Sequence, residues 1–228
     1  MTSDIWSVCL MSKKMYFTYG AMNCGKSAAL LQVAHNYEER GMHVLLAKPS
    51  IDTKGERKIV SRLGVSRDVD LLIPPDADVI GLICETMRAM ARSDASCDGT
   101  DGGRYVSCVL VDEAQFLTVT QVDQLHRLAY LHDMPVMCYG IRTGFLGQGF
   151  EGSIRLLEIA DELRELTTIC HCGRRATMNL RLVDGRPDFT PICDQYAIDT
   201  GKDNATYESV CPRCWHAAHD EWQREHHS

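Results

Sequence analysis

MYFTYGAMNCGKSAALLQ, residues 15–32, contains two glycines separated by four residues and followed directly by Lys-Ser. The aromatic run before the first glycine predicts a short strand, and apolar residues at helical spacing after Ser27 predict a helix that Gly41 ends. Backbone N–H groups of such a loop, together with the start of the helix, bind phosphate. A chance match at a glycine-rich turn is the alternative, and the flanking strand and helix argue against it. The stretch predicts a nucleoside triphosphate site but not the acceptor.

The loop supplies the first set of candidate nucleotide-binding residues. Lys26 is expected to reach the β- and γ-phosphates, and the Ser27 hydroxyl to ligate Mg²⁺. The whole set consists of Gly20, Ala21, Met22, Asn23, Cys24, Gly25, Lys26 and Ser27.

Composition narrows the class of protein. The chain has 228 residues, of which 45% are hydrophobic and 24% charged, and its net charge is −7. This length fits one α/β domain with a small addition. The acidic balance argues against a general nucleic-acid surface, which needs clustered Lys and Arg. No apolar run approaches the ~18 residues that span a bilayer. The first residues lack the order of a secretory signal, so we expect a cytoplasmic protein.

Strands and helices alternate from residue 15 to about residue 168. Strands are expected at residues 43–47, 106–111 and 135–140, and helices at residues 76–91 and 118–132, the last capped by Thr118 or Thr120. Continuous apolar strands alternating with helices predict a parallel sheet covered on both faces. The small, acidic, glycine-rich residues 92–104 read as a solvated loop. We expect a nucleotide-binding α/β domain at residues 12–169 and a second, smaller domain at residues 170–216.

The stretch CVLVDEAQF, residues 108–116, is the expected partner of the phosphate loop. It brings Asp112 and Glu113 to the carboxyl end of a buried strand, where ligands bind in open α/β sheets. Asp112 fits the role of holding Mg²⁺, and Glu113 that of a general base. The alternative is that the two acids cap the next helix. Arg62 and Arg142 are candidates to stabilise charge on the transferred phosphoryl group, or are surface cations.

Cysteines near the end of the chain predict a metal site. The chain has 11 cysteines, and two closely spaced pairs lie among the last five of them. Four thiolates leave no open coordination position, which favours structural zinc over a hydrolytic centre. An iron–sulfur cluster or four unrelated thiols are the alternatives, and Cys193 reads as a bystander. The four predicted ligands are Cys170, Cys172, Cys211 and Cys214.

Together these motifs resemble the type II thymidine kinase family, most closely its proteobacterial branch. The resemblance runs from about residue 14 to residue 215 and includes YGAMNCGKSAALLQ, IVSRLG, VLVDEAQFLT, PVMCYGIRTGF and ELTTICHCGRRATMNLRL. It implies transfer of the ATP γ-phosphoryl group to the 5′-hydroxyl of thymidine or deoxyuridine in deoxynucleotide salvage. It further implies a homotetramer, inhibition by thymidine triphosphate, and a zinc-held lasso over the nucleoside.

The resemblance also assigns roles to individual residues. Glu113 is implied as the base that accepts the 5′-hydroxyl proton, and Asp112 as the magnesium-holding residue. Arg62 is implied to contact phosphate. The nucleotide contacts extend through the acid motif, and two aromatic side chains are implied at the nucleoside. These further positions are Ala114 and Gln115 at the nucleotide, and Phe116 and Tyr207 at the nucleoside.

Three positions depart from the family pattern. Lys54 stands where relatives have Arg, Gly144 where an acidic residue is expected, and Cys214 where close relatives can have His. Two rival functions stay open. One is a kinase for a different nucleoside. The other is a zinc-ribbon ATPase that binds nucleic acid, which predicts a basic, aromatic face on the ribbon.

Overall fold

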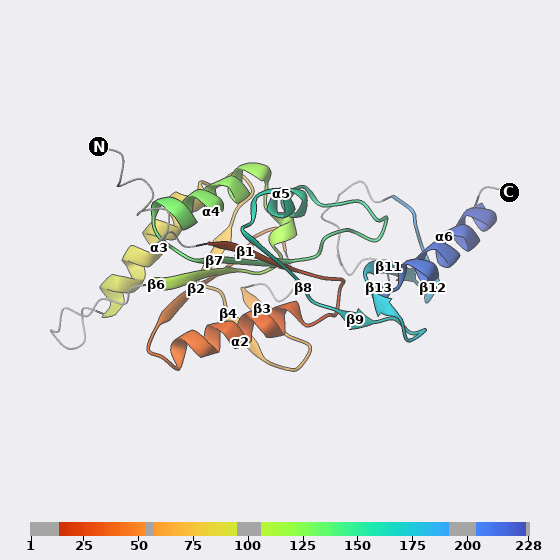
Figure 1. Ribbon diagram of the computed structural model, residues 1–228, viewed down its shortest axis with the longest axis horizontal. Coiled ribbons are helices and arrows are strands. Elements are labelled where there is room, and N and C mark those ends of the chain that lie inside the picture. Colours follow the sequence, from red (N-terminus) through yellow and green to blue (C-terminus); the bar gives the residue numbers. More distant parts are fainter. Residues whose placement is uncertain (1–13, 53–56, 95–105, 192–203, 227–228) are drawn as a thin grey trace, which may run out of the picture.

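The computed structural model describes residues 14–52, 57–94, 106–191 and 204–226. Two parts are distinct in Figure 1. Residues 14–52, 57–94 and 106–167 form a layered structure of one sheet and its helices, which we call the α/β body. Residues 168–191 and 204–226 form short strands and a final helix at one end of the molecule, which we call the cysteine-bearing region.

The α/β body is built on a six-stranded sheet whose neighbouring strands are all parallel, as the sequence predicted. The strand order is β5-β2-β6-β7-β1-β8. The strand that precedes the phosphate loop, β1, lies between β7 and β8, and the strand that carries the acids, β6, is two positions away. The strands are β1 (Met15–Tyr19), β2 (His43–Pro49), β5 (Leu71–Ile73), β6 (Val106–Val111), β7 (Val136–Gly140) and β8 (Glu162–Glu165).

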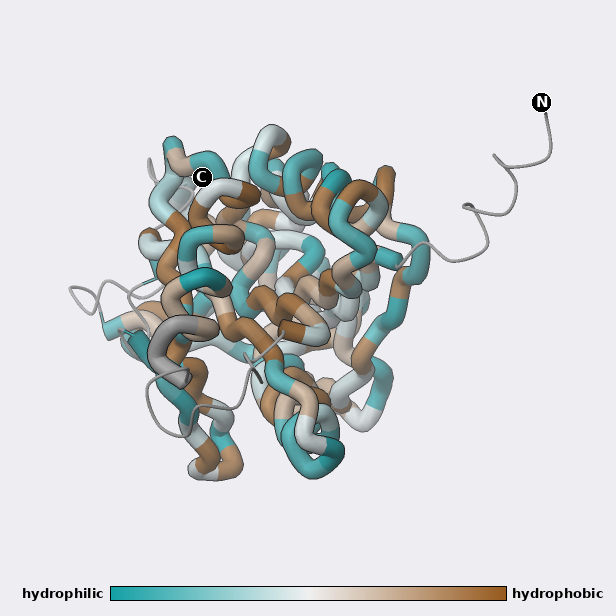
Figure 2. Tube along the Cα trace, turned by 90° about the vertical axis from the view of Figure 1, so that its left-hand side faces the viewer, coloured by the Kyte–Doolittle hydropathy of each residue, from teal (hydrophilic) through white to brown (hydrophobic). Residues whose placement is uncertain are grey.

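Helices cover both faces of this sheet (Figure 1). Helix α2 (Lys26–Glu38) packs on one face, and α3 (Val79–Asp94), α4 (Val119–Leu131) and α5 (Glu151–Ile159) pack on the other. Strand β2 shows why both faces are apolar. Its Leu46 packs with α2, whereas its Leu45 packs with the three helices opposite, because successive strand residues point to opposite faces. Seen from the side, apolar segments gather in the interior of the molecule (Figure 2).

Two helices show how well local signals set their ends. Helix α4 begins after Thr118, whose hydroxyl accepts a hydrogen bond from the backbone N–H of Gln121, while the Gln121 side chain accepts one from the Thr118 N–H. This capping box confirms Thr118 as the cap. Helix α3 begins three residues later than predicted and runs on to Asp94. The prediction of a loop was therefore wrong for residues 92–94, and its residues 95–104 lie outside the described part of the chain.

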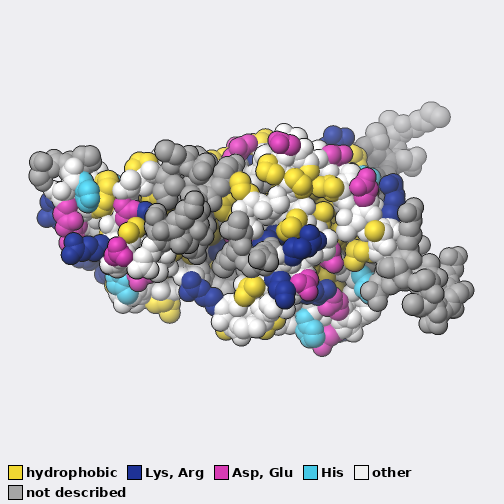
Figure 3. Space-filling view, turned by 180° about the vertical axis from the view of Figure 1, so that it is seen from behind, with side chains coloured by type: hydrophobic (Ala, Val, Ile, Leu, Met, Phe, Trp, Pro, Cys, Tyr) yellow, Lys and Arg dark blue, Asp and Glu magenta, His cyan; other side chains and the backbone are white. Residues whose placement is uncertain are grey.

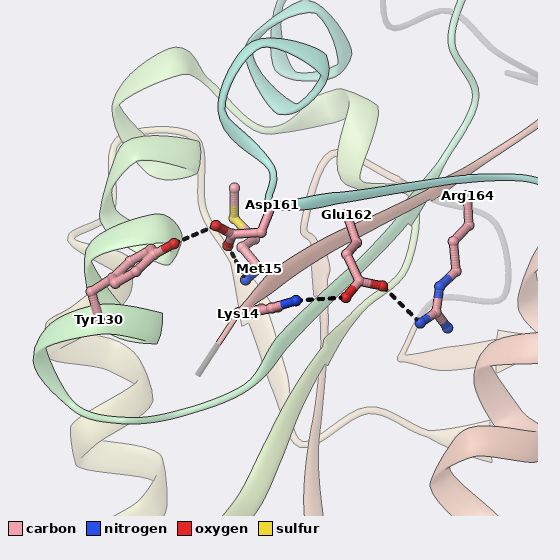
Figure 4. Close-up of polar contacts among 6 residues, drawn as sticks. All are labelled: Lys14, Met15, Tyr130, Asp161, Glu162 and Arg164. Atoms are coloured by element: carbon pink, nitrogen blue, oxygen red, sulfur yellow. Dashed lines mark hydrogen bonds and ion pairs between the residues drawn. The ribbon is translucent and has the colours of Figure 1, made fainter. Parts of the chain in front are cut away.

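Polar contacts join the start of β1 to β8 and α4 (Figure 4). They lie at the opposite end of β1 from the phosphate loop. The carboxylate of Asp161 accepts hydrogen bonds from the Met15 N–H, at 2.8 Å, and from the Tyr130 hydroxyl. Glu162 forms ion pairs with Lys14 and Arg164. These contacts align β8, an edge strand with much exposed surface, with its neighbour.

The cysteine-bearing region has small antiparallel sheets and a separate apolar cluster. Strand β11 pairs with β12 and β13, β9 pairs with β10, and helix α6 packs on the cluster that contains Trp215 and Phe189. Helix α6 continues to His226, ten residues past the predicted end of the second domain. The elements are β9 (Thr168–Ile169), β10 (Arg175–Ala176), β11 (Met178–Val183), β12 (Arg186–Pro187), β13 (Ala205–Val210) and α6 (Pro212–His226).

A further hairpin, β3 (Lys58–Val60) and β4 (Ser66–Asp68), lies beside α2, outside the central sheet. The surface of the face seen in Figure 3 carries acidic and basic side chains interspersed. Among the described residues, no helix has the length and apolar character needed to cross a membrane.

Candidate active site

The phosphate loop joins the carboxyl end of β1 to the start of α2, as the sequence predicted. Gly25 precedes the helix with φ +89° and ψ +17°, a left-handed conformation in which a side chain would be strained. The loop therefore reaches the helix through a backbone geometry that favours glycine, and the N-terminus of α2 faces the loop.

The ammonium group of Lys26 lies inside the loop. Lys26 is only 8% exposed, and its Nζ donates hydrogen bonds to the carbonyl oxygens of Ala21, at 2.8 Å, and Gly20, at 3.4 Å. The Sγ atom of Cys24 is 3.7 Å from the same nitrogen. A positive charge is thus held where a triphosphate would be bound by such a loop.

Asp112 lies beside the loop at the end of β6. Its neighbours Cys108 and Leu110 pack on the α2 side of the sheet, so strand alternation brings the Asp112 side chain to that same side. There Ser27 lies close enough to the carboxylate to favour its charged form. Burial, and secondarily the charge of Glu113, raise the pKa of Asp112 to about 7. The structure therefore brings together the two predicted magnesium-holding side chains, from positions 85 residues apart in the sequence.

Glu113 has an unusual backbone conformation and a defined side-chain partner. Its φ and ψ angles, +50° and +38°, are left-handed, which is uncommon for a residue with a side chain. It precedes the short 3-10 helix η1 (Ala114–Phe116), and its Oε2 accepts a hydrogen bond of 2.6 Å from Gln115 Nε2. It makes no side-chain cap bond to η1, and α4 is capped by Thr118. The alternative that this acid caps the next helix is therefore wrong.

Gln115 supports Glu113 from the protein interior. The residue is 2% exposed, and its Oε1 accepts a hydrogen bond of 3.1 Å from the Ile141 N–H. A Cβ atom on Gly140 would lie 2.7 Å from this oxygen, so the close approach requires glycine. Both ends of the amide are thus bound to the protein itself. Ala114 is fully buried, backbone included. Nucleotide binding by these two residues stays a prediction.

Phe116 forms an apolar wall near the acids. Its ring meets that of Phe150 edge-on at a centroid distance of 5.8 Å. Ile141 is buried with the two rings, and the partly buried Met22 packs against them. A flat, apolar base can pack on such a wall. Phe150 was not singled out from the sequence, because it lies 34 residues from Phe116 and belongs to no motif.

The two candidate arginines have different surroundings. Arg62 is exposed in the turn between β3 and β4, so its contact with phosphate stays a prediction. Arg142 follows β7 and lines a hollow beside the phosphate loop. The other residues that line this hollow are Tyr19, Gly20, Ala21, Thr143, Glu165, Thr177 and Asn179.

The three departures from the family pattern have different outcomes. Lys54 lies outside the described residues, but Asp52 forms an ion pair of 2.9 Å with Lys48, a buried lysine at the end of β2 that sequence reasoning missed. Gly144 lies in a tight loop, where its N–H donates to the Gln148 carbonyl. Cys214 belongs to the cysteine cluster.

The cysteine-bearing region contacts the phosphate loop directly. Tyr207 lies on β13, its ring 6.4 Å from that of Phe145, and its carbonyl oxygen accepts a hydrogen bond of 3.3 Å from Asn23 Nδ2. Sequence reasoning missed two further contacts, made by Asn179 and Ser209 to the backbone of Met22. Neither residue belongs to a nucleotide-binding motif. The structure therefore gives the phosphate loop neighbours from both parts of the molecule.

The four predicted metal ligands, Cys170, Cys172, Cys211 and Cys214, do form one cluster. Their sulfur atoms all lie within 4.8 Å of one another. A backbone hydrogen bond at Arg174, together with bonds from the neighbouring thiols, lowers the pKa of Cys172 to about 6, so its thiolate form is favoured. Four convergent sulfurs, with no other ligand grouped with them among the described residues, fit a closed tetrahedral site. Cys193 lies outside the described residues.

Comparison with known proteins places the chain in a family. The family model described as thymidine kinase matches residues 13–215. A thymidine kinase of Idiomarina loihiensis is 47% identical over 205 residues, which cover 90% of this chain and 96% of that protein. Those of Enterobacteria phage T4 and Rhizobium meliloti are 44% and 45% identical, covering 88% and 89% of this chain and 94% and 95% of their own lengths. The chain therefore belongs to the thymidine kinase family.

Proposed function

We propose that this protein transfers the γ-phosphoryl group of ATP to the 5′-hydroxyl of thymidine, and of deoxyuridine, in deoxynucleotide salvage. The observation that carries the proposal is the arrangement at the carboxyl edge of the sheet. There the buried ammonium of Lys26 and the adjacent Ser27, after β1, lie beside the acids Asp112 and Glu113, after β6. Family membership adds the acceptor, because the relatives are named thymidine kinases.

In this proposal the α/β body holds the triphosphate. The N–H groups of residues 20–27 and the Lys26 ammonium bind the phosphates, and Ser27 and Asp112 hold magnesium, which offsets the charge on the transferring group. Arg62 is proposed to approach the phosphates from the β3–β4 turn. Arg142 is the cation that the structure brings to the hollow beside the loop, which supports a second contribution to the same charge.

Glu113 is proposed to accept the proton of the 5′-hydroxyl as that oxygen attacks the γ-phosphorus and the bond to ADP breaks. Gln115 donates a hydrogen bond to the Glu113 carboxylate and is itself held by the Ile141 N–H. This support keeps the carboxylate in one orientation. A positioned base contributes about 10²–10⁴ in rate.

The nucleoside is proposed to lie between the two parts of the molecule. Phe116 would pack on the base and Tyr207 would approach it from β13. Met22 packs against the aromatic wall, and its backbone is hydrogen-bonded to the cysteine-bearing region. A nucleoside bound at this junction could therefore contact both the wall and the phosphate loop.

We further propose that the cysteine cluster binds zinc as a structural ion. Closed four-sulfur coordination is the usual structural zinc site, and an iron–sulfur cluster or four unrelated thiols are the alternatives. Elemental analysis of the purified protein distinguishes them: one zinc per chain supports the proposal, whereas iron with acid-labile sulfide, or no bound metal, contradicts it.

The domain division at residue 170, expected from the sequence pattern, completes the proposal, together with a homotetramer, a cytoplasmic location and inhibition by thymidine triphosphate, as the resemblance described above implies. Sedimentation equilibrium tests the tetramer, and addition of thymidine triphosphate to the kinase assay tests the inhibition. The rival, a nucleic-acid-binding ATPase, gains no support from the mixed charge on the face in Figure 3.

The proposed function is tested with a panel of acceptors. The metal-loaded protein is incubated with Mg-ATP and each of thymidine, deoxyuridine, deoxycytidine, deoxyadenosine and deoxyguanosine, and the products are separated by chromatography. Thymidine monophosphate should dominate, with deoxyuridine monophosphate second. A dominant product from another nucleoside would identify a different kinase, and ATP hydrolysis stimulated by nucleic acid without any monophosphate would support the ATPase.

A further inference from the structure

The backbone of Met22, in the middle of the phosphate loop, is bound on both sides by side chains of the cysteine-bearing region. Asn179 Oδ1 accepts a hydrogen bond of 2.7 Å from the Met22 N–H. The Ser209 hydroxyl donates a hydrogen bond to the Met22 carbonyl oxygen. One loop residue thus has both of its polar backbone groups bound by a segment more than 150 residues away in the sequence.

The geometry of the two strands explains why these side chains act together. Asn179 on β11 lies directly opposite Ser209 on β13, and side chains at paired positions share one face of a sheet. Asn179 is 2% exposed, and its Nδ2 donates a hydrogen bond of 2.8 Å to the Thr143 carbonyl. This second bond orients the amide so that its oxygen faces Met22.

A third contact involves the next residue of the loop. Asn23 Nδ2 donates a hydrogen bond to the carbonyl oxygen of Tyr207, which lies two residues from Ser209 on the same strand. The strands end near the cysteine cluster: β13 stops one residue before Cys211, and Thr177, next to β11, donates its N–H to the Val210 carbonyl. The side chains that bind the loop therefore belong to a pair of strands, β11 and β13, that ends beside the predicted metal ligand Cys211.

We propose that Asn179 and Ser209 are positioning residues that hold the phosphate loop in its nucleotide-binding conformation, so that the cysteine-bearing region contributes to ATP affinity. A loop that is ordered before the ligand arrives avoids the entropic cost of ordering it during binding. The proposal rests on the proposed function for the identity of the nucleotide, but the ordering of the loop can be measured without a nucleotide.

The test compares Asn179→Ala and Ser209→Ala with two reference variants in the metal-loaded protein. Asn204→Ala is the matched control, because Asn204 adjoins β13 but bonds the exposed Asp184. Ser209→Thr keeps the hydroxyl. Amide hydrogen exchange of peptides covering residues 20–27 is measured without ligand, and ATP affinity is measured by calorimetry. Zinc content is checked for every variant.

Both alanine variants should exchange faster in the loop and keep their zinc. ATP affinity should fall by about 10-fold for Asn179→Ala and by about 2- to 5-fold for Ser209→Ala, as expected for one to two lost hydrogen bonds. Asn204→Ala should match the wild type, and Ser209→Thr should restore most of the protection. If Asn179→Ala fails to fold, the comparison of Ser209→Ala with Ser209→Thr tests the proposal alone.

Unchanged exchange in residues 20–27 of the folded alanine variants would overturn the proposal. Faster exchange spread over the whole cysteine-bearing region, with loss of zinc, would also overturn it, because the residues would then be structural and not positioning. A wild-type protein that bound no ATP would contradict the proposed function, while the exchange measurement would still decide whether the loop is held.

Discussion

The α/β body and the cysteine-bearing region are stabilised in different ways. In the body, two apolar clusters cover the two faces of the sheet, and the larger has 21 buried members among the described residues. Counted in the same way, the cluster of the cysteine-bearing region has seven, of which two are the predicted metal ligands Cys170 and Cys211. Buried apolar area stabilises the body, whereas so small a cluster needs further support, which a metal can supply.

The difference matches a division of chemical roles. The groups proposed to act on phosphate, Lys26, Asp112 and Glu113, stand on the well-packed body. The contacts to the backbone of the loop, and Tyr207, come from the cysteine-bearing region. If the cysteine cluster binds zinc as proposed, the fixed geometry of the body is combined with a region whose order depends on an ion.

Metal removal should have the largest effect. Metal binding supplies on the order of ten kcal/mol of folding free energy to such sites. Chelation, or Cys172→Ser, should therefore raise hydrogen exchange throughout residues 168–191 and 204–226 and abolish kinase activity, while the helices of the body keep their protection. Cys84→Ser is the matched control, since Cys84 is a half-buried thiol on α3 outside the cluster. Loss of protection in both parts together would show that the α/β body and the cysteine-bearing region are not stabilised in different ways.

Glu113→Gln should lower the catalytic rate by about two or more orders of magnitude, because a positioned base contributes about 10²–10⁴. The substitution keeps the shape of the side chain, so ATP affinity and thermal stability should change little. Glu158→Gln, on the exposed surface of α5, is the control. The rate constant is obtained from single-turnover kinetics, and a rate within tenfold of the wild type would show that Glu113 is not the base.

Gly140→Ala should lower the rate by about tenfold through Gln115. The added methyl would lie 2.7 Å from Gln115 Oε1, and relieving this overlap displaces the support of Glu113. Overpacking also destabilises by about 1–3 kcal/mol. Gly144→Ala is the control, because its Cβ meets its nearest neighbour, Phe150, at an ordinary 3.6 Å. A stability loss without a change in rate would show that Gln115 does not position the base.

The smallest effect should be a pH dependence of stability at Asp112. Its pKa is raised from 3.8 to about 7, so the native state holds a proton that the unfolded chain releases. This contribution to stability is full below about pH 4 and is lost as the pH rises through about 7. In urea unfolding without nucleotide, the wild type should therefore lose stability relative to Asp112→Asn between pH 5.5 and pH 8. A constant difference would contradict the raised pKa.

Much of the α/β body could be predicted from the sequence because its signals are local. The phosphate loop, the apolar strands and the Thr118 cap each lie within a few residues, and the structure has them as predicted. The end of α3 was missed, because small polar residues after residue 91 resemble a loop although they continue the helix. Two cysteine pairs were enough to predict the cluster, since paired spacing is itself a metal signal.

The contacts that orient the site could not be predicted in this way. Gln115 meets Gly140 and Ile141 through the pairing of neighbouring strands, and Asn179 meets Met22 over a separation of 157 residues. Such contacts depend on where β7 and β11 end in space. No local pattern distinguishes a buried, bonded Asn from one that caps a turn.

The most direct test of the account is a crystal structure of the zinc-loaded protein with thymidine and a non-hydrolysable ATP analogue. The 5′-oxygen of thymidine should lie within about 2.6–3.2 Å of the Glu113 carboxylate, with the base against Phe116. The triphosphate should occupy the loop of residues 20–27, with Met22 still bound by Asn179 and Ser209. A nucleoside bound away from Glu113, or a loop that has left Asn179, would contradict it.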